Sequence, residues 1–359
     1  MSEIEEAAPP ATSGILATRL ELPSYDLLVE ALRDVDVRGF ILSRDERPWL
    51  LETWLTGKCL LQLGVDGAPS VCEIRVEADR TGVLLVGPDA PSKVVEGREL
   101  GPGTATLLSP GSLVSVGTPR ATTWITLSAA AEAARLEGAL LGGGDDLASP
   151  PPTFSVASAG RDVAALRALL VEVPRVRAAA PGALHPEAAR NLDRSLLRAL
   201  ALLSLGCAPE ARRKRPLRVD RPSAFRAISA FLRDLPAGPV YVEDLCLATG
   251  LPERTLRLLF LEIYGQSPVR VLRSRRLCLV YEALQAPGLG LKSIRTVAER
   301  NGFWHMGQFS SDYRALLGER PSDTVRKTRL SGARHRATRR DTAATVLPLP
   351  RAASRQDVV

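Results

Sequence analysis

Hydrophobic and polar positions change their period near the middle of the chain. Between Gly39 and Leu127, short apolar runs such as KCLLQLGV, SVCEIRVEA, TGVLLVGP and TATLLSP are separated by Gly, Pro and Asp at spacings of about 10 residues. This pattern predicts several antiparallel strands in a small barrel or sandwich. After residue 161 the apolar positions follow a helical period instead. We therefore predict an α+β fold, with a β-rich part followed by an all-helical part.

The segments that flank the predicted strands have helical patterns. SYDLLVEALRDVDVRG predicts a short amphipathic helix or the approach to the first strand, and AAAEAARLEGALLGGGDDLASPPP begins as a helix and ends as a loop. Further along, LDRSLLRALALLSL carries one apolar stripe, formed by Leu192, Leu196, Leu197, Leu200 and Leu203. Such a stripe packs against its own domain or pairs with the same helix of a second subunit.

Composition places the chain in a globular class. Its 359 residues are enough for two or three domains, and its mean hydropathy is +0.02. No apolar run approaches the length that spans a bilayer. The N-terminal stretch MSEIEEAAPPATSG is acidic and lacks the order of a signal peptide. We expect a cytoplasmic protein without a membrane partner.

Charge divides the chain into two unlike halves. Residues 1–150 carry 12 Lys and Arg against 22 Asp and Glu, a balance of −10, whereas residues 151–359 carry 35 against 18, a balance of +17. The basic half suits a polyanion, although charge alone leaves DNA, RNA and an anionic membrane open. The acidic half is expected to do a different task.

These patterns predict six segments. They are a disordered leader (1–14), a β-rich regulatory domain (15–150), a helical segment that is a candidate for dimerisation (151–207), a basic linker (208–221), a helical domain (222–327) and a disordered basic tail (328–359).

Cysteine and histidine usage argues against metal and redox chemistry. The cysteines include no CxxC pair and stand at Cys59, Cys72, Cys207, Cys246 and Cys278. We interpret them as small buried hydrophobes, with a thiol switch at Cys59 or Cys72 as the alternative. The three histidines, at His185, His305 and His335, all lie outside the β-rich region. We therefore predict no metal, no cofactor and no catalytic site, since a metal-dependent enzyme of this β type needs a histidine cluster.

The helical domain contains the order helix, tight turn, helix. In VYVEDLCLATGLPERTLRLLFLEIYG, Gly250 stands at the turn and Pro252 where a second helix would begin. Leu245, Ala248 and Leu251 share one side of the first helix and its turn. The second helix carries an apolar stripe formed by Leu256, Leu259, Phe260 and Ile263. This is the plan of a helix-turn-helix.

The same plan recurs in SIRTVAERNGFWHMGQFSSDYRALLG. Gly302 follows Gly250 at an offset of 52, and Tyr313 follows Phe260 at an offset of 53 because the second turn has one extra residue. Each copy closes with G-x-x-P. Between them, SPVRVLRSRRLCLVYEALQA predicts a long helix with four mostly outward arginines, Arg270, Arg273, Arg275 and Arg276. Two related units separated by such a helix could read successive major-groove segments of DNA.

The repeat, the stretch VAERNGFWHMGQFSSDYRALLGERPSDTVR and the linking helix resemble the DNA-binding domain of AraC/XylS-family transcription regulators. The resemblance covers about residues 222–327 and implies seven helices with two helix-turn-helix units. It implies that the first recognition helix presents Glu253, Arg254, Thr255 and Arg257, and the second presents His305, Met306, Gly307, Gln308 and Ser311. Pro252 replaces the Ser that usually begins the first recognition helix.

The residues around these positions are interpreted as scaffold. Phe303, Phe309 and Tyr313 are expected in the core, and Trp304 is expected to be partly buried. Of the DNA-facing side chains, Arg254, Arg257 and Gln308 are the strongest candidates for base contacts, because Arg suits guanine and Gln suits adenine.

The N-terminal half resembles, more weakly, the cupin-like domain of the XylS-like branch. The resemblance implies an effector-sensing or dimerising domain, contact with RNA polymerase, and a role that is most often activation. Trp49, Trp54 and Trp124 could line an effector pocket or fill the core. Two alternatives stay open at this point: a constitutive DNA-binding regulator without effector, and a cupin-like enzyme with a helical appendage.

Overall fold

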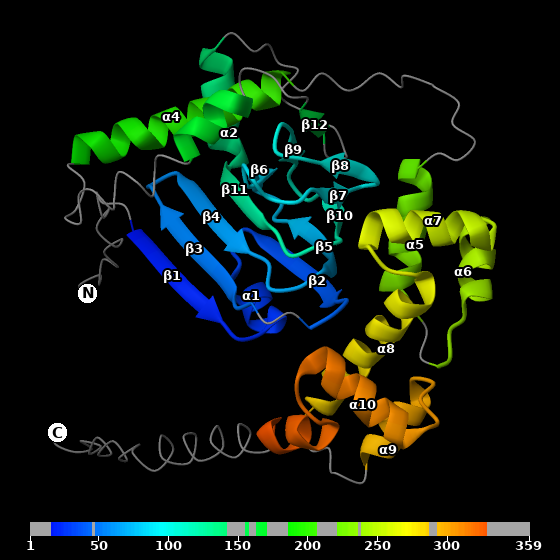
Figure 1. Ribbon diagram of the computed structural model, residues 1–359. Helices are drawn as coiled ribbons and strands as arrows, with labels where there is room; N and C mark the ends of the chain where they lie inside the picture. Colours follow the sequence, from blue (N-terminus) through cyan, green and yellow to red (C-terminus); the bar gives the residue numbers. More distant parts are fainter. Residues whose placement is uncertain are drawn as a thin grey trace, which may run out of the picture. The chain divides into compact units, whose positions relative to one another are not determined.

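The computed structural model describes residues 16–44, 47–141, 155–157, 163–170, 186–206, 221–235, 238–286 and 293–328 (Figure 1). The chain forms two compact units. The first comprises residues up to 236 together with 240–275, and the second comprises residues 237–239 and those from 276 onward. None of the described helices combines the length and the apolar character needed to cross a bilayer.

Two antiparallel sheets build the N-terminal part of the first unit (Figure 1). Sheet A has the order β1-β3-β4-β11-β6-β9-β12, and sheet B has the order β2-β5-β10-β7-β8. The strands of sheet A are β1 (Leu16–Leu22), β3 (Trp49–Leu55), β4 (Cys59–Val65), β6 (Arg80–Val86), β9 (Ala105–Leu108), β11 (Thr123–Ala130) and β12 (Ser155–Ala157). Those of sheet B are β2 (Val35–Ile41), β5 (Ser70–Val76), β7 (Lys93–Val95), β8 (Arg98–Leu100) and β10 (Leu113–Thr118).

Two apolar clusters lie on opposite faces of sheet A. Alternation along β6 places Val83 and Leu85 in one cluster and Leu84 and Val86 in the other. The cluster that contains Val83 and Leu85, here called the outer cluster, is covered by α2 (Ala131–Leu140), the helix at residues 163–170 and α4 (Pro186–Gly206). The cluster that contains Leu84 and Val86, here called the inner cluster, lies between the sheets and includes Leu28 of α1 (Tyr25–Ala31).

The leucine stripe of α4 packs against its own domain. Leu196 and Leu200 are 0% exposed and belong to the outer cluster of sheet A, together with Leu197 and Leu203. Of the two alternatives left open by the sequence, the structure therefore shows burial within the chain for this stripe.

The C-terminal part is helical. The first unit holds α5 (Arg221–Arg233), α6 (Val242–Thr249), α7 (Glu253–Tyr264) and the start of α8 (Pro268–Leu284). The second unit holds the rest of α8, α9 (Ser293–Arg300), α10 (Met306–Leu317) and a helix at residues 321–328. Among the described residues this makes seven helices from Arg221 onward.

The predicted α+β class, the β-rich sandwich with flanking helices and the helical domain are confirmed. The structure adds a strand that the sequence did not predict, β1, whose apolar residues are interrupted by Thr18, Arg19 and Glu21 and which lies at the edge of sheet A. The predicted leader, basic linker and tail, the GGGDD loop, Cys207, His185 and His335 lie outside the described residues, and the predicted domain boundaries stay predictions.

Candidate nucleic-acid interface and apolar cavity

The first helix-turn-helix consists of α6 and α7. Gly250 ends α6 with φ 68°, a left-handed conformation that favours glycine. Leu245 and Leu256 are 0% exposed and hold the two helices together. Pro252 precedes α7 and provides no side-chain cap for its first turn. Ala248, which the sequence predicted on the inner side of α6, is exposed.

One long face of α7 is open. Arg254 and Arg257 are exposed on it, and Leu258 and Leu261 add apolar surface, 62% and 50% exposed. The Arg257 guanidinium donates to the Glu253 carboxylate one turn earlier, over 2.6 Å. Arg254 forms no ion pair with any residue that the structure describes, so its guanidinium is available to a ligand.

The second helix-turn-helix repeats this construction in α9 and α10. Gly302 at the turn has φ 79°, and Gly318 ends α10 with φ 78°, as Gly265 ends α7 with φ 68°. A Cβ on Gly302 would lie 2.9 Å from Pro239, so this turn needs glycine for space as well as conformation. The extra residue of the second turn places the start of α10 at Met306, four residues after its glycine, against three in the first copy.

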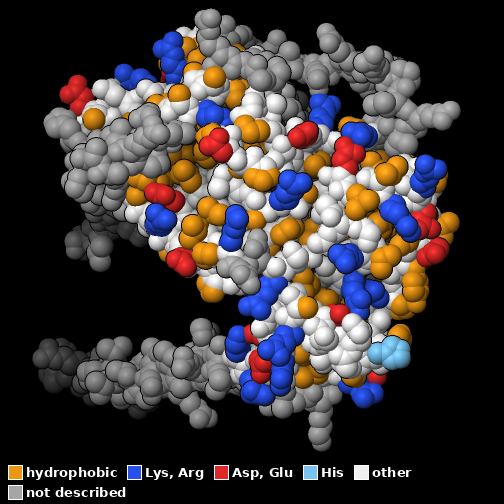
Figure 2. Space-filling view, viewed as in Figure 1, with side chains coloured by type: hydrophobic (Ala, Val, Ile, Leu, Met, Phe, Trp, Pro, Cys, Tyr) orange, Lys and Arg blue, Asp and Glu red, His pale blue; other side chains and the backbone are white. Residues whose placement is uncertain are grey.

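The open face of α10 is mostly polar. Gly307, Gln308 and Ser311 are exposed, and Arg314 lies one turn further along the same face. The Gln308 amide donates to the Asp312 carboxylate over 2.9 Å. His305 is the N-cap residue but its side chain makes no capping bond, which leaves first-turn N–H groups open to an anion. Figure 2 shows Lys and Arg side chains over the surface formed by α9, α10 and the helix at 321–328.

The predicted site residues fall into two sets, one on each recognition helix. Thr255 and Met306 are half-buried, whereas the others, Glu253, Arg254, Arg257, His305, Gly307, Gln308 and Ser311, are exposed. Three further exposed residues were not predicted: Leu258, Leu261 and Arg314. Helical periodicity was the available signal, since each lies three or four residues from a predicted contact.

Two expectations about the surroundings were wrong. Trp304 is 63% exposed, not partly buried, and it directly precedes the α10 N-cap. Among the arginines of α8, Arg273, Arg275 and Arg276 are half-buried rather than outward. Within the first unit, Arg275 stacks 5.4 Å from the Phe40 ring centroid, and within the second, Arg276 stacks 5.2 Å from that of Phe303. Phe303, Phe309 and Tyr313 are buried, as predicted.

The outer face of sheet B packs against the first helix-turn-helix region. A Cβ on Gly117 of β10 would lie 2.9 Å from the Ile263 side chain, so backbone and α7 are in direct contact. Arg233 of α5 donates to Glu73 of β5 over 2.8 Å. The carbonyl of Leu42 accepts from Gln266 and Ser274, each over 3.2 Å.

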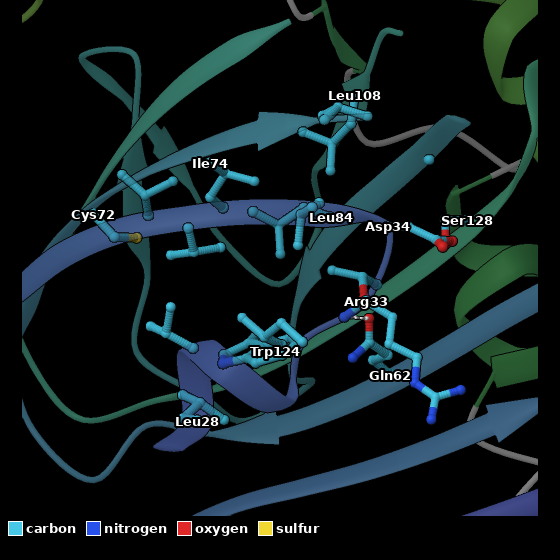
Figure 3. A pocket seen from close by; sticks show the side chains of 18 of the residues that line it. Leu28, Arg33, Asp34, Gln62, Cys72, Ile74, Leu84, Leu108, Trp124 and Ser128 are labelled. Carbon is cyan, nitrogen blue, oxygen red and sulfur yellow. Dashed lines mark hydrogen bonds between the residues drawn. The ribbon is translucent and has the colours of Figure 1, made fainter. Parts of the chain in front are cut away.

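The opposite face of sheet B lines a cavity between the two sheets (Figure 3). The cavity and its mouth enclose about 840 Å³ of space free of atoms, of which the centre of a water-sized sphere can occupy about 80 Å³. Its walls are mostly apolar and include Leu28, Ile74, Leu84, Leu108 and Trp124. Of the three tryptophans considered for such a pocket, Trp124 lines it, while Trp49 and Trp54 belong to the core.

The few polar groups of the cavity wall are mostly paired with each other. Lys93 Nζ lies 2.6 Å from Asp66 Oδ2 and donates to Thr118 over 3.2 Å, while Trp124 Nε1 donates to Asp66 Oδ1 over 2.8 Å. Asp34 pairs with Arg80 and accepts from Ser128 over 2.6 Å. Gln62 differs, as its Oε1 accepts from the Arg33 backbone but its buried Nε2 has no partner among the described residues.

The two cysteines considered for a redox switch are poor nucleophiles. Burial raises the pKa of both the Cys59 and the Cys72 thiols to about 12, so neither is ionised near neutral pH. This supports their interpretation as small hydrophobes. Within the described part of the chain, no three His, Cys, Asp or Glu side chains are grouped so that they could hold a metal ion.

Comparison with known proteins places the repeat in a family. A family profile described as a helix-turn-helix domain matches residues 245–327. The chain is 31% identical over 107 residues to XylDLEGF operon transcriptional activator 2 of Pseudomonas putida, which covers 30% of this chain and 68% of that protein. Activator 3 of the same organism is 30% identical over 107 residues, 32% of its length. The chain thus matches about a third of the length of that relative.

A solved structure extends beyond the repeat. The AraC-like transcriptional activator CuxR is 19% identical, with a TM-score of 0.39, over 74% of this chain and 95% of that one. The family assignment rests instead on activator 2, two thirds of whose length is matched, and on the doubled helix-turn-helix with its paired turn and C-cap glycines. The chain belongs to the AraC/XylS family of transcription regulators.

Proposed function

We propose that the protein is a sequence-specific DNA-binding regulator of transcription, and an activator rather than a repressor. The observation that carries the proposal is the repeated helix-turn-helix, in which α7 and α10 each present exposed polar or charged side chains opposite a buried aromatic or aliphatic face. An α-helix fits the major groove, where base edges are distinguishable. The matched relatives are named transcriptional activators, which supports the direction of regulation.

In this proposal the two recognition helices contribute unequally to DNA recognition. On α7, Arg254 is free to contact guanine. Arg257 must break its hydrogen bond to the Glu253 carboxylate, or keep that bond while it also contacts DNA. On α10, Gln308 is held by Asp312, and Ser311 and Arg314 suit phosphates. We assign base reading mainly to α7, with Glu253 and Thr255 beside it. The role of α10, through His305, Met306 and Gly307, is mainly to position the protein.

The N-terminal domain is proposed to sense a small-molecule effector in the cavity between the sheets. The observation behind this part is an apolar cavity with one unpaired buried amide, directly behind the sheet that contacts α5 and α7. Contact with RNA polymerase, a cytoplasmic location with its DNA target, and a non-enzymatic role follow from family membership and are part of the proposal. Homodimer formation is proposed through surfaces other than the buried α4 stripe.

Fluorescence anisotropy with the promoter regions bound in a genome-wide mapping experiment tests this function. We expect affinity to fall steeply with salt, because phosphate contacts release counterions. Arg254→Ala should cost about 1–3 kcal/mol on the preferred site and flatten sequence preference. Arg198→Ala on α4, also an exposed arginine, is the matched control and should change neither. Binding that is insensitive to salt, or an unchanged preference in Arg254→Ala, would contradict the proposal.

A further inference from the structure

We propose that the cavity binds a small uncharged ligand whose body is apolar or aromatic and which carries one hydrogen-bond acceptor, with Gln62 as the donor. This inference rests on the proposed function of the cavity as an effector site and adds the chemistry of what it selects. It follows from three features of the wall: its apolar surface, its closed ion pairs and the buried amide nitrogen of Gln62, which has no partner among the described residues.

The apolar surface sets the body of the ligand. Side chains from α1 and from both sheets converge on the space, and among them Leu28, Ile74, Leu84 and Leu108 offer only hydrocarbon (Figure 3). Burying a hydrocarbon or ring against such a wall removes apolar surface from water and is favourable. Trp124 adds an aromatic face, which suits a ring. Space for several water-sized spheres indicates a compact molecule with one ring or a short chain.

The ion pairs of the wall exclude a charged ligand. Both Lys93 and Asp66 are nearly buried, at 6% and 4% exposed, and each is already held by the other. Lys93 also donates a hydrogen bond to Thr118, and Asp66 also accepts one from Trp124, so both charged groups have further partners. Arg33 lies at the cavity, but its side chain is exposed and extends away from the other labelled side chains (Figure 3). A buried carboxylate or ammonium would therefore have no opposite charge to meet.

Gln62 sets the polar group of the ligand. It lies on β4 between β3 and β11, is 3% exposed, and faces the space between the sheets. Its Oε1 accepts from the Arg33 backbone over 3.4 Å, which directs the amide nitrogen elsewhere. A buried donor without a partner is costly, so a ligand acceptor at this nitrogen removes that cost. A carbonyl, ether or hydroxyl oxygen would serve.

Three probes of similar shape separate these requirements on the full-length protein. Acetophenone has a ring and a neutral acceptor, ethylbenzene lacks the acceptor, and benzoate carries a charge. Isothermal titration calorimetry and thermal unfolding should show that acetophenone binds and raises Tm. Ethylbenzene should bind about tenfold more weakly, because Gln62 stays unpaired. Benzoate should produce no shift.

Replacing the donor should change the order of preference. In Gln62→Leu, ethylbenzene should bind at least as tightly as acetophenone, because the amide that donates to the carbonyl has been removed. The comparison is a ratio within one variant, so a loss of overall stability does not obscure it. Thr106→Val is the matched control: like Gln62→Leu it removes a buried polar group that has no partner among the described residues, but at a residue outside the cavity wall, and it should keep the wild-type order.

Three results would overturn the inference: benzoate binding as well as acetophenone, an unchanged order of preference in Gln62→Leu, or no stabilisation by any probe. Salt-dependent, sequence-specific DNA binding measured on the same preparation decides the proposed function separately. Failure of the cavity chemistry with DNA binding intact would leave the regulator in place and remove only the ligand class.

Discussion

Two oppositely charged side chains of α7 form an ion pair on the surface that is proposed to contact DNA. Glu253 and Arg257 are i, i+4 neighbours joined by a 2.6 Å hydrogen bond, and both are more than half exposed. Such a pair adds little to stability, about 0.3–0.5 kcal/mol. We propose that its greater effect is on recognition, because the Glu253 carboxylate would repel phosphate and hold Arg257 away from a base. In this proposal Glu253 disfavours non-specific contact with DNA.

Glu253→Gln should therefore strengthen binding to any duplex more than binding to the preferred site. The substitution removes a negative charge and frees Arg257, so affinity for a scrambled duplex should rise several-fold and the specificity ratio should fall. Anisotropy titrations on both duplexes at two salt concentrations measure this. Glu132→Gln, at an exposed glutamate on α2, controls for net charge alone. Equal changes in the two variants would show that Glu253 has no special position.

Among the structural elements, α7 and α10 were predictable and the cavity was not. A repeat of 26 or 27 residues with a glycine turn and an aromatic stripe fixes which helix faces are buried, since 3.6-residue periodicity leaves one choice. It does not reveal that Trp304 is exposed, because hydrophobicity alone suggested burial. The open faces, including Arg314, follow once the buried faces are known.

In the β-sheet part, the sequence pattern predicts which side chains face inward but not the cavity between the sheets. Alternation indicates that Gln62 shares the inward register of Leu60 in β4, so a polar residue facing a core was a signal present in the sequence. A cavity, however, forms where the side chains of α1 and of the two sheets together occupy less volume than the space between these elements. A local sequence pattern does not predict this unfilled volume. The unpredicted β1 lacked a continuous apolar run for the same reason that edge strands often do: one face meets water.

Arg314→Ala should weaken binding of α10 to DNA without changing which sequence is preferred. Arg314 lies one turn beyond Ser310 and Ser311, and two turns beyond Gly307, on the open face, where its long side chain suits a phosphate. We expect a loss of about 1 kcal/mol on preferred and scrambled duplexes alike, and a salt slope reduced by about 1. Arg295→Ala on α9, also exposed, is the control. A change in sequence preference would mean that Arg314 reads a base.

In the first unit, sheet B is a single layer of strands between the cavity on one face and the first helix-turn-helix region on the other. Along β5, Cys72, Ile74 and Val76 face the cavity, while Glu73 faces α5 and pairs with Arg233. Because successive side chains point to opposite faces, a small shift of one strand is felt on both sides. Burial raises the pKa of Glu73, and Arg233 opposes that rise. The contact is therefore sensitive to any change in packing behind it.

The Glu73–Arg233 pair should make the stability of this contact depend on pH. A carboxyl group with a raised native pKa binds more protons folded than unfolded, so the charged form costs stability as pH rises through that pKa. Glu73→Gln should therefore be neutral or stabilising at pH 7, and its advantage should shrink as pH falls towards the ordinary glutamate range. Arg233→Gln should destabilise at pH 7 by about 1 kcal/mol, since Glu73 loses its partner. Urea unfolding of both variants at several pH values measures the difference, and a destabilising Glu73→Gln would contradict it.

If sheet B carries information between the cavity and the first helix-turn-helix, ligand and DNA affinities must be linked. Acetophenone should change DNA affinity by a factor in the range of about 5–150, and DNA should change acetophenone affinity by the same factor. Arg233→Gln, which loosens the outer face without touching the cavity or the open face of α7, should reduce that factor while leaving each separate affinity nearly unchanged. Gln62→Leu should instead shift the response to higher acetophenone concentrations, because the carbonyl has lost its amide donor. A linkage factor that survives Arg233→Gln would place the coupling outside this pair, for example at the direct contact between Gly117 and Ile263, where Gly117→Ala would be the next substitution to test.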